Sequence, residues 1–545
     1  MKKTYKRWIA LPLAGVLFFA GCAAKENQGT SVVPGDNTQN TGAETVSGNS
    51  ETPVDTGNTE TGTTLVFNED MFSNRDMRTD YSDYVTVNLA DNATAAAEGV
   101  TVEGSTVTIT KEGTYYFTGT LTDGQIVVNV DEAEKVQIVL DNVNIACEGS
   151  AALYVISADK VFVTTVKGTT STLKSTGEFV STDDNNINAA VFSKEDLTLN
   201  GEGTLVVECE TGHAVVSKDD LKVTSGTYEL TAAKNGLRGN DSVRIAGGTI
   251  TIDAGTDGIH AENEDTSKGY IYIAGGTLDI TAQNDAMDAS GDLVIDDGDI
   301  TVKTAGGASG TASSGNMFGQ GGFGGWGQTS SSSSSSEEST KGLKSDTQIT
   351  INGGTLTLSC ADDAVHSNGS LTVNGGILQI TSDDDGVHAD YELVVNGGTL
   401  NINAHEGLEA TVITINDGEI TISASDDGIN AAQKVNGYTP TFTLNGGTVT
   451  ISMGQGDTDA VDSNGNIVIN GGTLKITAQS AFDYDGKAEL NGGTVYVNGT
   501  QVTSLTNQFG GMEGMGGPGG QGGFGPGGNG GNGGHGPGGQ GGFRP

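Results

Sequence analysis

The feature that most constrains this chain is a two-strand unit copied many times along it. In the clearest copy, residues 349–360, apolar and polar residues alternate on both sides of an Asn352-Gly353-Gly354 turn. Strict alternation is the period of a strand with one buried face, and glycine supplies backbone angles that other residues resist. The unit recurs at residues 243–261, 271–289, 371–389, 393–410, 413–431, 442–463 and 467–484. A unit copied this often indicates a repeat protein.

The spacing of the copies predicts the fold class. Where no insertion intervenes, the turn glycines recur about every 22 residues, in the range of parallel β-solenoids. Each period offers two longer strands and a short third one, such as residues 386–389. We therefore predict an all-β fold, a right-handed three-sided parallel β-helix whose stacked repeats form one body. The asparagines before the turns should stack as a hydrogen-bonded ladder; they are Asn352, Asn374, Asn396, Asn445, Asn470 and Asn491.

The two ends of the chain carry targeting and linker signals. Residues 1–22 have a basic start, a short apolar run and a Phe-Ala-Gly-Cys sequence that resembles a bacterial lipobox, so we expect a lipoprotein signal peptide and a lipid on Cys22. Residues 23–64 read as a disordered tether and residues 505–545 as a disordered Gly-rich tail. We expect an extracellular monomer, anchored through this lipid to the outer face of the cell membrane.

Between these ends, residues 65–504 should form the β-helix. The repeat is indistinct over about 65–120, which we interpret as an N-terminal cap over the open core. Residues 305–340 are rich in Gly and Ser and predict a flexible loop inserted into one rung.

Charge and cysteine content exclude several functions. The formal net charge of −43 excludes nucleic acid as a partner, and an acidic polysaccharide could bind only with intervening cations. Cys147, Cys209 and Cys360 each end an alternating apolar run and fit neither a disulfide framework nor a zinc motif. We expect them to be buried free thiols.

A corner of recurring pattern follows each second strand: an acid, Gly or Ala, an apolar residue, a polar residue and a small residue, as in residues 257–261. Stacking the rungs turns this corner into two files of side chains. The acid file contains Asp257, Asp285, Asp363, Asp385, Glu406, Asp427 and Asp459. The polar file contains Arg238, His260, Asp288, Lys344, His366, His388, Glu409, Asn430 and Asp462.

The acid file predicts calcium as a cofactor. Neighbouring rungs lie roughly 4.8 Å apart, so stacked carboxylates repel one another unless a cation neutralises them. Calcium, with oxygen ligands at about 2.3–2.6 Å, fits between two such rungs. We predict that the acid file, with Asp288, Glu409 and Asp462, ligates Ca²⁺. The alternative is that each Asp only caps its own turn.

The other polar side chains of the corner are candidate ligand contacts. We expect His260, His366, His388 and Asn430 to face solvent on the third sheet and to contact carbohydrate. A zinc site at the histidines, with His213, is a weaker alternative, because they lie among oxygen ligands that suit calcium.

At these residues the chain resembles two families. The stacked Asn turns, the acid file and the three-strand rung resemble the right-handed β-helix of pectate lyases. The lipoprotein tether, the Asn-Gly-Gly-Thr rungs and the Asp385-Gly386-Val387-His388 corner resemble more closely the clostridial cellulose- and acid-sugar-binding β-helix family. This second resemblance covers about residues 65–500 and implies a calcium-bearing cell-surface β-helix that binds plant cell-wall polysaccharide without cleaving it.

Two other functions stay open. A pectate lyase needs an Arg or Lys base beside its calcium, and the candidates are Arg238 and Lys344. An adhesin or rod would need no glycan at all. An acid repeated at every rung favours repeated binding sites, and a single Trp after the signal peptide, Trp326, favours an acidic glycan such as polygalacturonate over cellulose.

Overall fold

The computed structural model describes residues 66–68, 71–180, 185–309, 339–454 and 458–507. The chain divides into two units, Met1–Thr61 and Gly62–Pro545, and the fold below is that of the second unit alone. The predicted signal peptide with Cys22, the tether, most of the insert and most of the tail lie outside the described residues.

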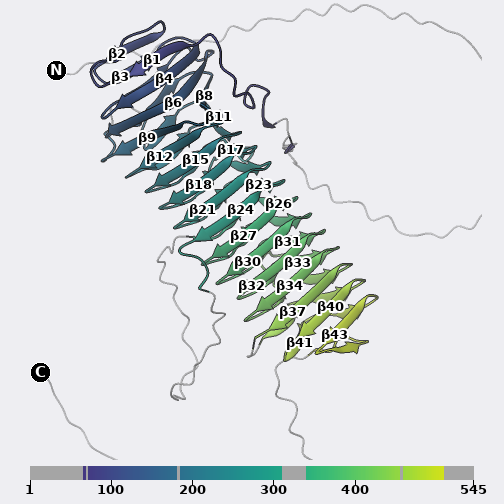
Figure 1. Cartoon of the computed structure of the whole chain (residues 1–545). Helices are drawn as coiled ribbons and strands as arrows, with labels where there is room; N and C mark the ends of the chain where they lie inside the picture. The colour runs from purple at the N-terminus through teal and green to yellow at the C-terminus, as the bar shows by residue number, and fades with distance from the viewer. Residues whose placement is uncertain (1–65, 69–70, 181–184, 310–338, 455–457, 508–545) are drawn as a thin grey trace, which may run out of the picture. The chain divides into compact units, whose positions relative to one another are not determined.

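The described residues form a three-sided parallel β-helix, which confirms the predicted fold. Most strands pair in parallel with the third strand before and the third strand after them, so that three strands make one turn of the solenoid. The successive rungs can be followed in chain order from β9 to β43 (Figure 1). The described residues contain no α-helix, and among them no segment is suited to cross a membrane as a helix.

Face A is built by the first strand of each rung. β31 (Val387–Val395) and β33 (Leu408–Ile415) are long enough to run from face C into face A. The other strands of face A are β8 (Lys160–Thr165), β11 (Asp196–Gly201), β14 (Asp220–Val223), β17 (Ser242–Ile245), β20 (Tyr270–Ile273), β23 (Leu293–Ile295), β26 (Gln348–Ile351), β29 (Ser370–Val373), β36 (Thr441–Leu444), β39 (Asn466–Ile469) and β42 (Ala488–Leu490).

Face B is built by the second, strictly alternating strand of each rung. Its strands are β9 (Thr170–Thr176), β12 (Thr204–Cys209), β15 (Thr227–Ala232), β18 (Thr249–Ala254), β21 (Thr277–Ala282), β24 (Asp299–Thr304), β27 (Thr355–Cys360), β30 (Ile377–Ser382), β32 (Thr399–Ala404), β34 (Glu419–Ala424), β37 (Thr448–Met453), β40 (Thr473–Thr477) and β43 (Thr494–Val497).

Face C is built by the short third strands, which carry the polar file. Besides the first parts of β31 and β33, its strands are β7 (Leu153–Ser157), β10 (Ala189–Ser193), β13 (His213–Ser217), β16 (Leu237–Gly239), β19 (Ile259–Ala261), β22 (Met287–Ala289), β25 (Leu343–Ser345), β28 (Val365–Ser367), β35 (Ile429–Ala431), β38 (Asp459–Ser463) and β41 (Ser480–Tyr484).

The two ends of the solenoid depart from this pattern. An antiparallel hairpin begins the N-terminal end, and β44 pairs antiparallel with β43 at the C-terminal end. The N-terminal strands are β1 (Val85–Leu89), β2 (Val100–Glu103), β3 (Thr106–Ile109), β4 (Gly113–Leu121), β5 (Gln125–Asn129) and β6 (Lys135–Glu148), and the last strand is β44 (Thr500–Val502). β5 pairs with β7 of face C, and the long β6 pairs with β8 of face A and β9 of face B.

The predicted cap region is divided between two positions. Residues 85–121 form the first strands, whereas residues 71–80 cross the outer surface of face A. There Phe72 stacks on Tyr272, with ring centroids 6.0 Å apart, and the fully buried Asp76 lies 2.7 Å from the Lys160 ammonium. This segment therefore covers several rungs of the solenoid side.

The interior is one continuous apolar cluster from Val87 to Leu505, made by the inward residues of all three faces. Cys147, Cys209 and Cys360 belong to it as buried free thiols, which confirms their prediction. Because each rung buries its apolar face only against its neighbours, stability is shared between adjacent rungs.

The predicted asparagine ladder is confirmed, and it includes Asn416 as a further member. Each side-chain amide from Asn374 to Asn491 donates to the Asn oxygen of the preceding rung, over 2.7–3.0 Å. All members point the same way, so the first amide, of Asn352, needs an acceptor, which is the Asp296 carboxylate at 2.7 Å. The same carboxylate accepts the Tyr272 hydroxyl at 2.6 Å.

Candidate functional site

The strand register on face C confirms the polar file. The paired residues run from Arg238 through His260, Asp288, Lys344, His366, His388, Glu409 and Asn430 to Asp462 and then Asp483. The acid file also stacks, because the backbone N–H after each of its members donates to the carbonyl of the next member, as from Gly258 to Asp285 at 3.0 Å.

One rung of the acid file was missed by the sequence analysis. Lys341 occupies the acid position of the rung that follows the insert, three residues before Lys344 in the polar file. Its backbone carbonyl accepts from Ala286, and Gly342 donates to the carbonyl of Asp363. The three-residue spacing to Lys344 was the available signal, but the residue type did not match the acidic pattern.

In the first rungs, a histidine lies between carboxylates. His260 Nδ1 is 3.0 Å from Asp257 Oδ2 and 3.3 Å from Asp288 Oδ2. Burial alone would lower the pKa of His260, but these two carboxylates raise it to about 9. Beside it, the Arg238 guanidinium lies 3.0 Å from the Glu262 carboxylate. The positive charges of this pair of rungs are therefore already matched by carboxylates.

The next rung carries two lysines. Lys344 Nζ lies 3.3 Å from Asp285 Oδ2 and 3.1 Å from Asp288 Oδ1. Burial opposes the charged form, but the two carboxylates raise the pKa of Lys344 above its ordinary value. Lys341 Nζ lies 2.9 Å from both Asp362 Oδ2 and Asp363 Oδ2. The rung that follows the insert therefore supplies two lysines, which pair with the acids of the preceding rung and of the following rung.

Histidines again occupy the two rungs that follow. His366 Nδ1 is 2.7 Å from Asp363, and its ring stacks on that of His388 with centroids 4.5 Å apart. His388 Nδ1 lies 2.8 Å from both Asp385 Oδ2 and Glu409 Oε2. Although burial would lower it, contact with these carboxylates raises the pKa of His388 to about 10.

Lys434, from the loop after β35, reaches back to the same cluster. Its Nζ lies 2.7 Å from Glu409 Oε2. Burial would raise the pKa of Glu409, but His388 and Lys434 lower it to about 2. This carboxylate is therefore ionised and held by two cations.

The C-terminal rungs have a different charge pattern. Among the described residues, no ion pair forms at Asp427 or Asp462, and Asp427 Oδ1 accepts only the backbone N–H of Asp459, at 3.1 Å. Burial raises the pKa of Asp427 to about 8; burial, with the charges of Asp483 and Asp459, raises that of Asp462 to about 6. Burial and the charge of Glu409 raise the pKa of Glu406 to about 7. Among the described residues, Asp427 and Asp462 therefore have no cation in contact, whereas the charge of Lys434 acts on Glu406.

Asn430 lies where the two charge patterns meet. Its side-chain amide donates to Glu406 Oε2 at 2.9 Å and to Glu409 Oε1 at 3.1 Å. Its Oδ1 is buried and accepts no hydrogen bond from the described residues, and only 9% of the residue is exposed to solvent. A buried acceptor with no donor is costly, and Asp462 is the next residue of the file.

The three histidines lie on face C as predicted, but the expected exposure is wrong for His388, which is 7% exposed. His260 and His366 are partly buried and contact carboxylates, because residues three apart at the corner project to the same side and meet. His213 is also buried, outside the acid file, and burial lowers its pKa to about 3. Whether these residues contact carbohydrate stays a prediction.

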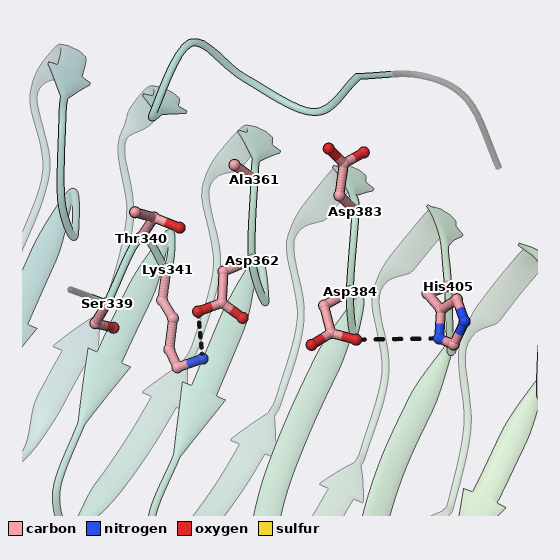
Figure 2. Close-up of a pocket in the computed structure, with 8 residues that line it drawn as sticks. All are labelled: Ser339, Thr340, Lys341, Ala361, Asp362, Asp383, Asp384 and His405. Atoms are coloured by element: carbon pink, nitrogen blue, oxygen red, sulfur yellow. Dashed lines mark hydrogen bonds and ion pairs between the residues drawn. The ribbon is translucent and has the colours of Figure 1, made fainter. Parts of the chain in front are cut away.

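A polar groove of about 700 Å³ lies beside the files, at the turns between faces B and C (Figure 2). Its lining residues are Ser339, Thr340, Lys341, Ala361, Asp362, Asp383, Asp384 and His405. It was not predicted from the sequence. The available signal was the additional acids of Asp362-Asp363 and Asp383-Asp384-Asp385, where most other corners have a single acid and only Asp426-Asp427 has a second one.

A family model and one relative give this chain the same family. The family model of carbohydrate-binding domain-containing proteins matches residues 103–386 and 369–460. A carbohydrate-binding domain-containing protein of Acetivibrio thermocellus is 40% identical over 220 residues, which are 40% of this chain and 76% of the relative. A solved structure, described as the polysaccharide lyase-like protein from C. thermocellum in a gadolinium derivative, is 38% identical and covers 41% of this chain and 91% of its own, with a TM-score of 0.40.

Proposed function

The chain belongs to the family of carbohydrate-binding domain-containing proteins, and from this premise we propose that it binds an acidic plant cell-wall polysaccharide through calcium, without cleaving it. Polygalacturonate is the model ligand, with cellulose as the second candidate. In this proposal Cys22 carries a lipid that holds the protein on the outer face of the cell membrane. The protein acts as a monomer.

The C-terminal rungs fit a calcium ion better than the rungs before them. From Asp257 to Asp385 most carboxylates of the two files already contact a Lys or His side chain. Asp427 is the acid-file residue of the rung of Asn430, whose buried Oδ1 is a carbonyl-type ligand, and Asp459 and Asp462 belong to the next rung, where Asp462 pairs with Asn430 in the strand register. Calcium prefers six to eight such oxygens. A bound ion would supply positive charge that a uronate carboxylate can share.

The observation that carries the proposal is Asn430 Oδ1, a buried acceptor without a donor beside carboxylates without a cation. A buried carbonyl without a donor, next to carboxyl groups that repel one another when ionised, is unfavourable, and a cation between them would remove both costs. The same cation would remove the repulsion between Asp427 and Asp462, because the charge of Asp462 contributes to the raised pKa of Asp427.

The two lyase candidates are occupied by other contacts. A general base must be deprotonated to accept a proton, yet Asp285 and Asp288 stabilise the charged form of Lys344. Arg238 is paired with Glu262. These contacts support binding over cleavage. The following experiment distinguishes a binding protein from a lyase and from an adhesin rod.

The test is electrophoresis of the full chain through native gels that contain polygalacturonate, with calcium or with a chelator. We expect retardation only with calcium, and loss of both retardation and calorimetric calcium binding in Asp427→Asn/Asp462→Asn. The matched control, Asp299→Asn/Glu419→Gln, makes the same charge change at exposed positions of face B and should behave as the wild type.

Three results would contradict the proposal. Unchanged mobility in both gels would favour the adhesin, and retardation that persists in chelator would exclude calcium bridging. Unsaturated uronide absorbing in the ultraviolet would show that the protein is a lyase.

A further inference from the structure

The histidine His260 has its two ring nitrogens in different surroundings. The outer nitrogen, Nε2, lies 3.4 Å from Glu262 Oε2 and donates a hydrogen bond to it, because a carboxylate only accepts. Arg238 lies 3.0 Å from the same oxygen and holds Glu262 in place. In the neutral ring, a proton on Nε2 leaves a lone pair on Nδ1. Metal-binding histidines have this arrangement, in which an outer carboxylate fixes the ring and directs the other nitrogen to the metal.

The inner nitrogen, Nδ1, is close to two carboxylates but has no hydrogen bond. It lies 3.0 Å from Asp257 Oδ2 and 3.3 Å from Asp288 Oδ2, yet this buried atom is not hydrogen-bonded to any described residue. The distances are short enough for hydrogen bonds, so it is their direction that fails. His366 and His388, at the same position of later rungs, each hydrogen-bond through Nδ1 to the acid three residues before, over 2.7–2.8 Å. An unpartnered buried nitrogen between two carboxylate oxygens therefore distinguishes the rung of His260.

The three atoms around this point have the spacing of ligands to a small transition-metal ion. Zinc lies about 2.0–2.2 Å from an imidazole nitrogen or a carboxylate oxygen, so two such ligands at a tetrahedral angle are about 3.3 Å apart. The two contacts of His260 Nδ1, at 3.0 and 3.3 Å, match this spacing. Calcium takes oxygen ligands at about 2.3–2.6 Å, whereas an imidazole nitrogen suits zinc and other transition metals. One nitrogen and two carboxylate oxygens therefore favour a transition metal over calcium.

The charges in contact around His260 leave a place for a divalent ion. Four carboxylates and two fixed cations take part: Asp257, Glu262, Asp285, Asp288, Arg238 and Lys344. With the ring neutral, two negative charges stay unmatched, and a divalent ion balances both, whereas a proton on the ring balances one. Lys344 lies 3.1 Å from Oδ1 of Asp288, so that Oδ2 faces His260. The carboxylates raise the pKa of His260 to about 9, which shows that they stabilise positive charge at this point.

We propose that Asp257, His260 and Asp288 bind a divalent transition-metal ion, with His260 Nδ1 and one oxygen of each carboxylate as its ligands. The ion joins β19 to β22, because His260 and Asp288 are paired residues of neighbouring rungs. Three protein ligands leave a coordination position for water or an external ligand. Asp257 and Asp288, predicted from the sequence as calcium ligands, here serve a different class of metal. The site is separate from the proposed calcium site at Asp427 and Asp462, and it does not depend on carbohydrate binding.

The test is equilibrium dialysis of the full chain, made without an affinity tag, against Zn²⁺ in excess calcium. We expect a zinc ion that calcium does not displace, and His260→Gln should bind one zinc ion fewer than the wild type. Glu262→Gln changes an exposed side chain, so this variant should fold, and the loss of the outer carboxylate should weaken zinc binding about tenfold. The matched control is His366→Gln, whose Nδ1 is already hydrogen-bonded, and it should keep the ion.

Hydrogen exchange of the wild type locates the ion without any variant. Because a bound ion stabilises the state that binds it, zinc should slow exchange in β19 and β22. The proposal is overturned if the wild type binds no zinc in calcium, or if His260→Gln and Glu262→Gln bind zinc as the wild type does. It is also overturned if zinc protects β28 and β31 instead of β19 and β22. None of these results would change the calcium-dependent gel, so the two proposals fail separately.

Discussion

The same corner of the β-helix has opposite charge balance in two regions of the molecule. In the paired region, from Asp257 to Glu409, Lys and His side chains lie between the stacked carboxylates. In the acidic region, from Asp427 to Asp483, no such cation accompanies Asp427 or Asp462 among the described residues. The backbone register is the same in both regions.

The acid repeated at each corner therefore has different roles in the two regions. Where the polar file supplies a cation, the acid completes an internal ion pair and stabilises the stack. Where the polar file supplies Asn430 and Asp462, the stack retains unmatched negative charge that an external cation can neutralise. Four predictions test this division between the paired and the acidic region.

The largest expected effect follows from removing a paired carboxylate. Glu409→Gln removes one of the carboxylates that contact the buried His388, and it also removes the carboxylate that pairs with Lys434. Breaking a buried ion pair costs about 3 kcal/mol, so amides of β31 and β33 should exchange with solvent roughly 100-fold faster. The matched variant in the acidic region, Asp462→Asn, should not accelerate exchange in chelator, and equal acceleration in both variants would contradict the division.

A smaller effect is expected from calcium itself. A ligand at 100 times its dissociation constant stabilises the state that binds it by about 2.7 kcal/mol. Added calcium should therefore slow hydrogen exchange in β35 and β38 but leave β19 and β22 unchanged. Protection that increases evenly along the solenoid would show that calcium does not distinguish the two regions.

The pH dependence of the two regions should differ in chelator. The pKa of Asp427 is raised to about 8, so its protonated form stabilises the fold and that contribution is lost as pH rises from about 4 towards 8. The raised pKa of His260, about 9, and the lowered pKa of Asp288 give contributions that are both retained between pH 4.5 and 6.5. Over this interval, exchange corrected for its intrinsic pH dependence should accelerate in β35 and β38 and stay constant in β19; β22 is left out because burial also raises the pKa of the neighbouring Asp285.

The smallest effect serves as an internal reference, because the asparagine ladder runs through both regions. Asn374→Ala, beside the paired region, and Asn470→Ala, beside the acidic region, each remove two ladder hydrogen bonds, one donated to the preceding rung and one accepted from the following rung. The two bonds together should cost about 1–2 kcal/mol, measured by local hydrogen exchange, and neither variant's cost should depend on calcium. A calcium-dependent cost at Asn470 would mean that the ladder itself responds to the ion.

The repeat could be predicted closely because its signals are local. Alternation, turn glycines and the asparagine before each turn established the three-strand rung, and the spacing of the corners placed Arg238, His260 and Asp288 in one file. Lys341 was overlooked because it breaks the acidic pattern after an insertion, and the position of residues 71–80 against face A depends on contacts such as Asp76 with Lys160, 84 residues apart in the chain.

By itself, the sequence determined the solenoid, its register and the residues that stack, because each rung repeats a short pattern of backbone and side-chain preferences. Only the tertiary structure decided which carboxylates meet a cation. That outcome depends on side chains from neighbouring rungs and from a distant loop, as when His388 and Lys434 converge on Glu409. Electrostatic pairing acts through space over a few ångströms. The residue type at one position of the sequence does not specify which charged side chain will lie that close to it.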